Sequence, residues 1–317
     1  MAETTDVAVI GGGAIGGYLA AAAAAAGHRV TLCVRTPIET LRAESSGQTR
    51  LVSVRIATDP DQVAAAKLIL LAAKTHQTGG TLPWLRRLIG PGSTVVAVQN
   101  GVDDRPVTDA VHAAAPAGTR PAVVPTTVYL SSTLCSPGHI VYRPGGLLYL
   151  PDDDDGRRVA SLLTGADLTV VSTPEFETLR WRKFCLNVAA GAVTALFRQP
   201  LGIVRQSPID LFAHTLAAEA AAVGARLGHD LGADLPAEIV ADLQSRPPGH
   251  GTSMLRDRLA GRPLEIGALN QTVVDRGAAI GVPTPLNRTV VQALTGPEAN
   301  AEPTAVLQTT TKGDTSP

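Results

Sequence analysis

The sequence predicts two domains: an α/β domain with a doubly wound, mainly parallel sheet, and then an all-helical domain. In the first half, short continuous apolar runs alternate with segments of helical length, which is typical of parallel strands covered on both faces. After Pro174 no strand pattern remains, and one helical segment follows another. We therefore predict a first domain over residues 1–173, a second over 174–296 and a disordered tail over 297–317.

The first domain is predicted to begin with a strand, a glycine turn, an alanine-rich helix and a second strand. Further apolar runs predict two more strands of the parallel sheet, separated by helices. These elements cover residues 7–10, 14–26, 30–34, 68–72, 83–89, 94–98 and 103–113. From residue 122 shorter runs separated by Pro and Gly predict an appended meander, with strands over 123–130, 139–142 and 147–150.

Four successive aspartates, residues 152–155, follow the meander. They lack the spaced ligands and the glycine of a calcium-binding loop, so we expect a solvated turn without chemistry. Beyond them, five helices are expected in the second domain, over residues 175–197, 208–227, 235–245, 265–280 and 285–294.

The composition argues against several classes of protein. The 27 Lys and Arg balance 28 Asp and Glu, and no basic run is interleaved with aromatics, so no nucleic-acid partner is expected. Cys33, Cys135 and Cys185 lack zinc-site spacing, so we expect reduced thiols in a cytoplasmic protein and no metal. The uncharged stretch 7–26 is interrupted by glycines and follows no Lys or Arg, so neither a signal peptide nor a membrane span is expected. A small-molecule ligand is favoured, and the oligomeric state, a homodimer included, is left open.

The glycine turn predicts a dinucleotide site. It satisfies the G-x-G-x-x-G pattern directly after a strand and at the start of a helix. In this context backbone N–H groups and the positive end of the helix meet a pyrophosphate, where a Cβ would block the approach. The predicted cofactor-binding residues of the turn are Gly11, Gly13, Ala14, Ile15 and Gly16.

The end of the second strand distinguishes NAD from NADP. An acidic residue there accepts hydrogen bonds from the ribose hydroxyls of NAD, whereas a cation suits the 2′-phosphate of NADP. This sequence has Arg35 and no Asp or Glu over 33–36. We therefore predict NADPH as the cofactor, with a surface arginine that binds no ligand as the alternative interpretation of Arg35.

The first helix of the second domain carries two candidate site residues. After a polar start it is almost entirely apolar, and Asn187 is an exception. Asn187 lies four residues after Lys183, so both share one helix face, and an unpartnered buried amide would cost about 1–3 kcal/mol. Either a ligand or a core hydrogen bond would satisfy Asn187. Taken alone, Lys183 also fits a lysine whose stem covers apolar surface while its ammonium reaches water.

With these residues in view, the sequence resembles the ketopantoate reductase (2-dehydropantoate 2-reductase) family. The resemblance spans nearly the whole chain, and the motifs occur in the family's order. Besides the glycine turn and Arg35 they are residues 73–77 (AKTHQ), 99–101 (QNG), 136–140 (SPGHI), 181–183 (WRK) with Asn187, 253–257 (SMLRD), and 265–266 (EI) with Asn270. The resemblance implies a Rossmann domain followed by a helical domain, in agreement with the elements above.

The resemblance also implies a reaction. It is the NADPH-dependent reduction of 2-dehydropantoate (ketopantoate), a 2-oxo acid, to pantoate, a step of pantothenate biosynthesis. An ammonium beside the ketone would stabilise the charge on its oxygen and deliver the proton, while a carboxylate would accept a hydrogen bond from the substrate hydroxyl. The implied roles are general acid for Lys183, ligand of the hydroxyl for Glu265, substrate binding for Asn100, Asn187 and Ser253, and a place near the cofactor for Lys74, Gln77 and Asn100.

Three of these residues have a plainer interpretation. Asn100 precedes Gly101, as in a simple turn after a strand. Ser253 suits a helix N-cap, and Glu265 suits the first turn of a helix, where the dipole favours an acid.

One position departs from the family. Where the family's helix usually carries a second asparagine, this sequence has Gly191. The change predicts either an opened space for a different substrate or close packing of a neighbouring helix. Another 2-oxo acid or related carbonyl compound is therefore the alternative substrate. A non-catalytic NADPH-binding sensor is a third hypothesis. The presence of Lys183, Asn187 and Glu265 argues against it, because a sensor needs no proton donor.

Overall fold

A six-stranded parallel sheet forms the centre of the first domain in a computed structural model that describes residues 4–165 and 167–296. The strand order is β5-β2-β1-β6-β7-β8, so the chain winds outward in two directions from the junction of β1 and β6. The strands are β1 (Asp6–Ile10), β2 (Arg29–Cys33), β5 (Arg55–Ala57), β6 (Leu68–Leu71), β7 (Thr94–Ala97) and β8 (Ala122–Pro125).

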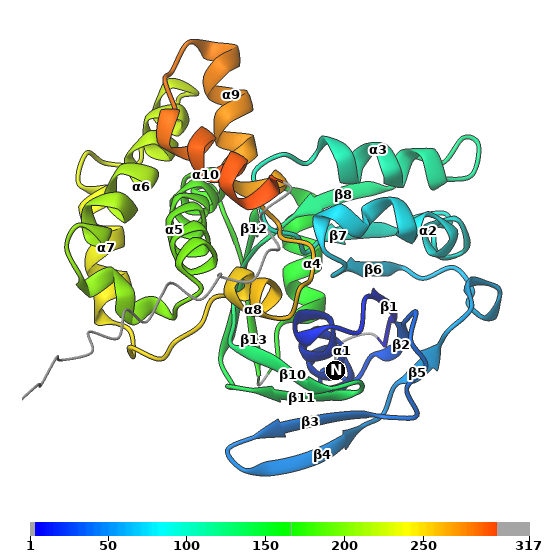
Figure 1. The fold of residues 1–317 in the computed structure, drawn as a ribbon. Helices are drawn as coiled ribbons and strands as arrows, with labels where there is room; N and C mark the ends of the chain where they lie inside the picture. Colours follow the sequence, from blue (N-terminus) through cyan, green and yellow to red (C-terminus); the bar gives the residue numbers. More distant parts are fainter. Residues whose placement is uncertain (1–3, 166, 297–317) are drawn as a thin grey trace, which may run out of the picture.

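Helices cover both faces of this sheet (Figure 1). They are α1 (Ala14–Ala25) on one face and α2 (Leu82–Leu88) and α3 (Arg105–Ala114) on the other. Val7 and Val9 of β1 pack with α1, whereas Ala8 and Ile10 pack with α2 and α3. Successive strand residues point to opposite faces, so the continuous apolar runs reflect burial on both sides. The predicted Rossmann-like sheet is confirmed.

Two smaller sheets complete this domain, in the orders β10-β11-β3-β4 and β13-β12-β9. Their strands are β3 (Leu41–Ser45), β4 (Gln48–Val52), β9 (Thr127–Tyr129), β10 (Ser132–Ser136), β11 (His139–Tyr142), β12 (Gly146–Pro151) and β13 (Leu168–Thr173). The first of these sheets packs closely on α1, where a Cβ on Gly17 would lie 2.9 Å from Cγ2 of Ile140. The small side chains of α1 therefore allow a second sheet to lie on it.

The predicted strand over 123–130 is wrong as a single element. Its first part, β8, belongs to the main parallel sheet, and its second part, β9, pairs antiparallel with β12. The break follows Pro125, which has no N–H group to continue the ladder. Thr126 stabilises the change of sheet, because its hydroxyl donates to the carbonyl of Ala97 at 3.0 Å.

The four aspartates are largely exposed, as predicted, but the predicted turn is wrong, because the run leads into a helix. Asp153 accepts a hydrogen bond from the N–H of Gly156 at 2.7 Å and caps helix α4 (Asp154–Leu163). Asp154 and Asp155 occupy the first turn, where the helix dipole favours negative charge. The acidic run thus begins a helix that connects β12 to its parallel neighbour β13.

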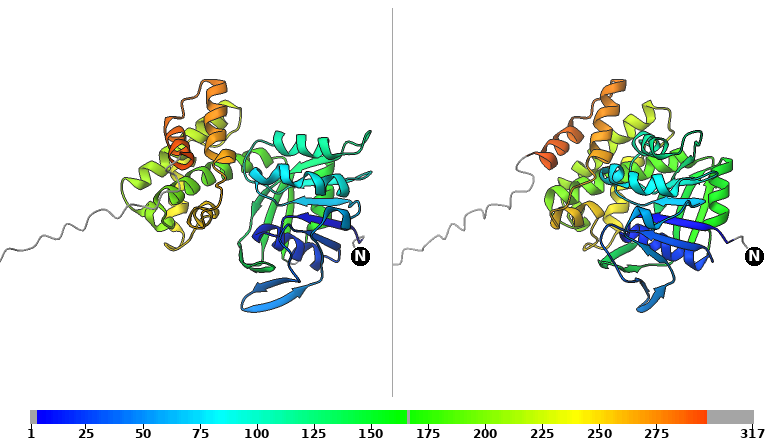
Figure 2. Two further views of the ribbon diagram at one scale, coloured as in Figure 1. Left: turned by 45° about the vertical axis from the view of Figure 1, so that its right-hand side comes forward. Right: turned by 90° about the vertical axis from the view of Figure 1, so that its right-hand side faces the viewer.

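The second domain is helical, and in the described part of the chain no strand follows residue 173. Figure 2 shows it beside the sheet domain. It contains α5 (Phe176–Phe197), η3 (Leu201–Arg205), α6 (Ile209–Arg226), α7 (Leu235–Ser245), α8 (Ser253–Leu259), the π-helical turn η4 (Gly267–Gln271), α9 (Thr272–Ile280) and α10 (Pro285–Thr295). Helix α8 lies outside the predicted helices, and the helix predicted to begin at Glu265 begins two residues later, with a π-helical turn.

The boundary predicted at residue 173 falls between the end of β13 and the start of α5 and stays a prediction. The tail predicted over 297–317 lies outside the described residues. Among the described helices, none combines the length and the apolar character needed to cross a bilayer.

Candidate active site

A cleft of about 1660 Å³ lies between the two domains. One wall consists of the carboxyl ends of β1, β2, β6 and β7 together with the segment from β9 to β10. The other wall consists of α5, α8 and the segment before η4. Ligands of doubly wound sheets bind at this edge, where the strand order reverses. Every residue predicted for the site lines the cleft except Gly16.

The glycine turn forms a cradle that side chains would fill. Gly11 has φ +112°, and a Cβ there would lie 3.0 Å from the backbone N of Ala73. Gly13 is the N-cap of α1, and no side chain caps the helix, so its first N–H groups face the cleft. Gly16 lies behind the turn, where a Cβ would lie 1.8 Å from the carbonyl oxygen of Gly11. This geometry fits a pyrophosphate at the helix end, and Gly16 serves the packing of the turn.

Arg35 follows β2 at the rim of the cleft. Its side chain is exposed, and no carboxylate of the described chain pairs with it. The guanidinium is therefore available to an anionic ligand.

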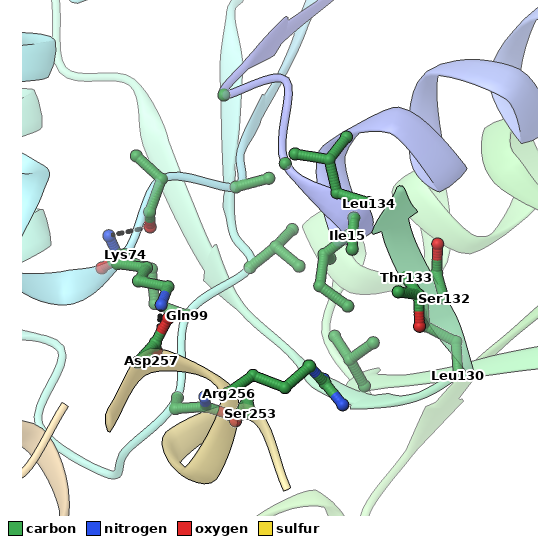
Figure 3. A pocket seen from close by; sticks show the side chains of 18 of the residues that line it. Ile15, Lys74, Gln99, Leu130, Ser132, Thr133, Leu134, Ser253, Arg256 and Asp257 are labelled. Atoms are coloured by element: carbon green, nitrogen blue, oxygen red, sulfur yellow. Dashed lines mark hydrogen bonds and ion pairs between the residues drawn. The ribbon is translucent and has the colours of Figure 1, made fainter. Parts of the chain in front are cut away.

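An ion pair joins the two walls. Lys74 follows β6, and its ammonium contacts the carboxylate of Asp257 on α8, as Figure 3 shows. Asp257 is 3% exposed and also accepts from Nε of Arg262 at 3.0 Å. So deeply buried a carboxylate requires such partners. Asp257 ends the motif over residues 253–257, and nothing in the local sequence connects it to Lys74.

Two glutamines lie near the carboxyl end of β6. The side-chain amide of Gln99 donates to the carbonyl of Ala73 at 2.9 Å and to the hydroxyl of Thr78 at 3.0 Å. Gln77 is held through its backbone N–H, which donates to the carbonyl of Lys74 at 2.8 Å. Gln99 therefore fixes the loop that carries Lys74 and Gln77 into the cleft.

Lys183 projects from α5 into the cleft. Its ammonium donates to the carbonyl of Val128 and lies 4.8 Å from the centroid of the Tyr129 ring. Burial lowers the pKa of Lys183 to about 8. In the described chain no carboxylate pairs with this ammonium. A group with three N–H donors and one carbonyl partner retains donors for a ligand.

Three segments that are distant in sequence contribute a chain of hydrogen bonds. Nδ2 of Asn100 donates to Oε2 of Glu265 at 2.9 Å, and Nδ2 of Asn187 approaches Oδ1 of Asn100 at 3.5 Å. Glu265 is 8% exposed. Asn187 thus approaches another amide of the cleft at long distance, and not a group of the helical core.

Asn270, which follows Glu265 in the family motif, serves the helical core. It is fully buried and donates to Oδ1 of Asn287 at 2.9 Å.

Ser253 is the first residue of α8 and lines the cleft. The N-cap is Thr252, whose hydroxyl accepts from the N–H of Leu255 at 3.0 Å, so the N-cap alternative for Ser253 is wrong. Arg256 lies one turn further on, and Figure 3 shows its side chain crossing toward Leu130. Arg256 is a further cleft residue that the sequence did not single out.

Gly191 does not line the cleft. A Cβ at this position would lie 3.2 Å from Cε of Met254 on α8. The opened space considered for Gly191 is therefore filled by Met254, and close packing of α5 against α8 is the interpretation that the structure supports. Among the described residues, no group of three or more His, Cys, Asp or Glu is placed to hold a metal ion.

Comparisons with known proteins agree with this arrangement. The model of the family "Ketopantoate reductase PanE/ApbA" matches residues 7–155, and that of its C-terminal domain matches residues 175–298. A 2-dehydropantoate 2-reductase of Caulobacter vibrioides is 37% identical over 92% of this chain and 98% of its own.

Solved structures share the fold. A dimeric ketopantoate reductase of Staphylococcus aureus has a TM-score of 0.80 and 23% identity, covering 91% of this chain and 97% of its own. D-Mandelate dehydrogenase, in a ternary structure with NADH and anilino(oxo)acetate, has a TM-score of 0.79 and 21% identity, covering 90% and 96%. On the matches to the family models and to the Caulobacter enzyme, the chain belongs to the ketopantoate reductase family, which consists of nicotinamide-dependent oxidoreductases.

Proposed function

We propose that this chain reduces ketopantoate to pantoate with NADPH as the reductant. The observation that carries the proposal is the position of Lys183: a buried ammonium without a carboxylate partner, in the same cleft as the glycine turn. The family supplies the substrate by name, since the Caulobacter relative is a 2-dehydropantoate 2-reductase. The chemistry of the cleft supplies the roles of the residues.

The glycine turn and Arg35 are proposed to bind the cofactor. The open N–H groups of α1 would receive the pyrophosphate, and the Arg35 guanidinium would bind a 2′-phosphate beyond β2. Lys74 and Gln77, held at the end of β6, would lie beside the cofactor. Bound in this orientation, NADPH supplies a hydride to the ketone carbon.

Lys183 is proposed as the proton donor. As the new C–H bond forms, the C=O π electrons move to the ketone oxygen, and an adjacent ammonium stabilises that charge. Lys183 then transfers one proton to this oxygen, which yields the alcohol and a neutral amine. The amine regains a proton from solvent before the next turnover. With a pKa of about 8, the Lys183 ammonium gives up its proton more readily than an ordinary lysine, and the side chain is still mostly protonated at neutral pH.

The amide and carboxylate groups are proposed to orient the substrate. Glu265 can only accept while ionised, so it suits the substrate hydroxyl. Asn100 and Ser253 can donate to the substrate carboxylate from the two walls of the cleft, and Asn187 can donate to it or to Asn100. In the absence of substrate the Asn100–Glu265 bond keeps this buried carboxylate satisfied.

The test is a steady-state assay with ketopantoate against a panel of 2-oxo acids, each with NADPH and with NADH. The proposal predicts the highest kcat/KM for ketopantoate with NADPH. A kcat/KM for another 2-oxo acid far above that for ketopantoate would refute the substrate, and a preference for NADH would refute the cofactor.

A second candidate keeps the reaction and changes the substrate to another 2-oxo acid. Gly191 does not distinguish the two candidates, because it lies outside the cleft and Met254 fills its space. The fold alone does not determine the substrate, because D-mandelate dehydrogenase has the same fold. A homodimer and a cytoplasmic location stay predictions.

A further inference from the structure

An aromatic ring lies against the proposed proton donor. Tyr129 is the last residue of β9 and lines the cleft. The centroid of its ring is 4.8 Å from Nζ of Lys183, while the carbonyl of the preceding residue, Val128, accepts from the same ammonium. Two adjacent residues of one strand thus hold the cation, one by a carbonyl and the other by a ring face.

The ring is held in place by the small sheet. Tyr129 pairs with Leu147 on β12. Its ring also makes an edge-to-face contact with Tyr149, with 6.0 Å between centroids and an interplanar angle of 86°. The side chain is 39% exposed, so the sheet fixes one part of the ring while the rest faces the cleft.

We infer that Tyr129 is a positioning residue for the proton donor: its ring face holds the Lys183 ammonium in the cleft and favours its charged form. This inference rests on the proposed function of Lys183. A cation over an aromatic face is attracted by the ring quadrupole, most strongly where water is excluded. A ring also takes none of the ammonium N–H donors, whereas a carboxylate would engage one and retain the proton.

The Tyr129 phenol stays uncharged beside Lys183. Tyr149 on β12, Arg182 on α5 and Asp242 on α7 influence the Tyr129 phenol electrostatically, but burial is the largest effect and raises its pKa above the ordinary value of 10. The phenol is therefore neutral in any ordinary assay. Burial lowers the pKa of Lys183, and the ring opposes that effect.

The charged groups nearby are engaged elsewhere. Arg182 pairs with Glu238 at 2.5 Å. Asp242 pairs with Arg246 at 2.7 Å. Glu265, the carboxylate of the amide network, accepts from Asn100. Within the described chain, the Lys183 ammonium thus has two partners: the backbone carbonyl of Val128 and the ring of Tyr129.

The experiment compares Tyr129→Leu with Tyr129→Phe in the full-length protein. Leu retains apolar bulk but no π face, so the basic limb of the pH profile of kcat/KM for ketopantoate should move down by about half to one pH unit. At pH 8 kcat should fall by about 2- to 6-fold, while the Kd of NADPH stays within about twofold. Phe retains the ring and should keep both the limb and kcat close to wild type. Phe197→Leu is the matched control, because it removes a ring of similar exposure (40%) that lies outside the cleft.

Three results would overturn the inference. They are an unchanged basic limb in Tyr129→Leu, a loss in Tyr129→Phe as large as in Tyr129→Leu, and an equal shift in Phe197→Leu. If Tyr129→Leu does not fold, Tyr129→Met provides the same loss of the π face.

A direct titration separates this inference from the proposed function. The pKa of Lys183, measured by NMR on isotopically labelled protein, should fall in Tyr129→Leu whatever substrate the enzyme uses. A wild-type protein that ignores ketopantoate would refute the proposed substrate only, whereas an unchanged NMR pKa would refute the role of Tyr129.

Discussion

The two walls of the cleft are built differently. The sheet-domain wall presents the backbone of the glycine turn and of the open end of α1, with the side chains of Lys74 and Gln77 beside them. The helical wall presents side chains from three segments: Lys183 and Asn187 on α5, Ser253 on α8 and Glu265 before η4. In the proposed function the first wall binds the dinucleotide, and the second determines the reaction. Substitutions on the second wall should impair turnover, whereas those at the rim of the first should impair cofactor choice.

The largest effect is expected at Lys183. Lys183→Ala removes the proton donor and the cation beside the ketone oxygen, so kcat should fall by about 10²–10⁴-fold. Binding of NADPH, followed by fluorescence titration, should persist. Lys67→Ala is a suitable control, because the Lys67 side chain is exposed, lies outside the cleft and donates to the carbonyl of Pro91. Near-normal turnover of Lys183→Ala would remove this residue from the mechanism.

A smaller effect on the same wall is expected from pH. The donor must be protonated, and burial lowers the pKa of Lys183 to about 8. For the free enzyme kcat/KM should therefore be retained below pH 8 and fall about tenfold per pH unit above it. A rate profile that is flat up to pH 10 would contradict this assignment.

On the sheet-domain wall, Arg35 is expected to determine the preference for NADPH. Arg35→Ala should weaken NADPH binding by about 10- to 100-fold through the loss of a charge-assisted contact, and should leave NADH binding nearly unchanged. Arg42→Ala, at an exposed arginine outside the cleft, provides the matched control. Equal losses for both cofactors would show that Arg35 does not contact the 2′-phosphate.

The smallest effect concerns the packing behind the helical wall. Gly191→Asn should destabilise the protein by about 1–3 kcal/mol, because a buried amide would have to displace Met254. Gly191→Ala is the control and should change the free energy of unfolding by less than about 1 kcal/mol, since the flexible end of Met254 can yield. Urea denaturation measures both. An Asn variant as stable as wild type would mean that room for the amide exists after all.

The same contrast explains what the sequence could predict. The unit β1-α1-β2 has strong local signals, namely apolar strands, a glycine turn and an alanine-rich helix, and it occurs as predicted. Strand β4 has almost no such signal, because four of its five residues are exposed and it exists through pairing with β3. Helix α8 is seven residues long and depends on the cap at Thr252, too short a pattern to recognise.

In the site, too, the residues with a local sequence signal could be predicted, and the pairs that are distant in sequence could not. The cofactor turn could be derived from residues 11–16 alone. The pair of Asn100 and Glu265 is separated by 165 residues, and that of Lys74 and Asp257 by 183, so no spacing rule could connect them. The family resemblance placed Asn100, Glu265 and Lys74 in the cleft. It gave no role to Asp257, which only the folded chain reveals.

The segment after Asn100 has a mechanical consequence. Arg180 of α5 donates to the carbonyl of Gly101 at 3.2 Å and holds the carboxylate of Asp104, and Arg276 of α9 donates to the carbonyl of Val102 at 2.8 Å. This loop of the sheet domain is thus fastened to the helical domain. A substitution that breaks these contacts would therefore loosen the loop and shift Asn100 relative to Glu265, although neither arginine reaches the cleft.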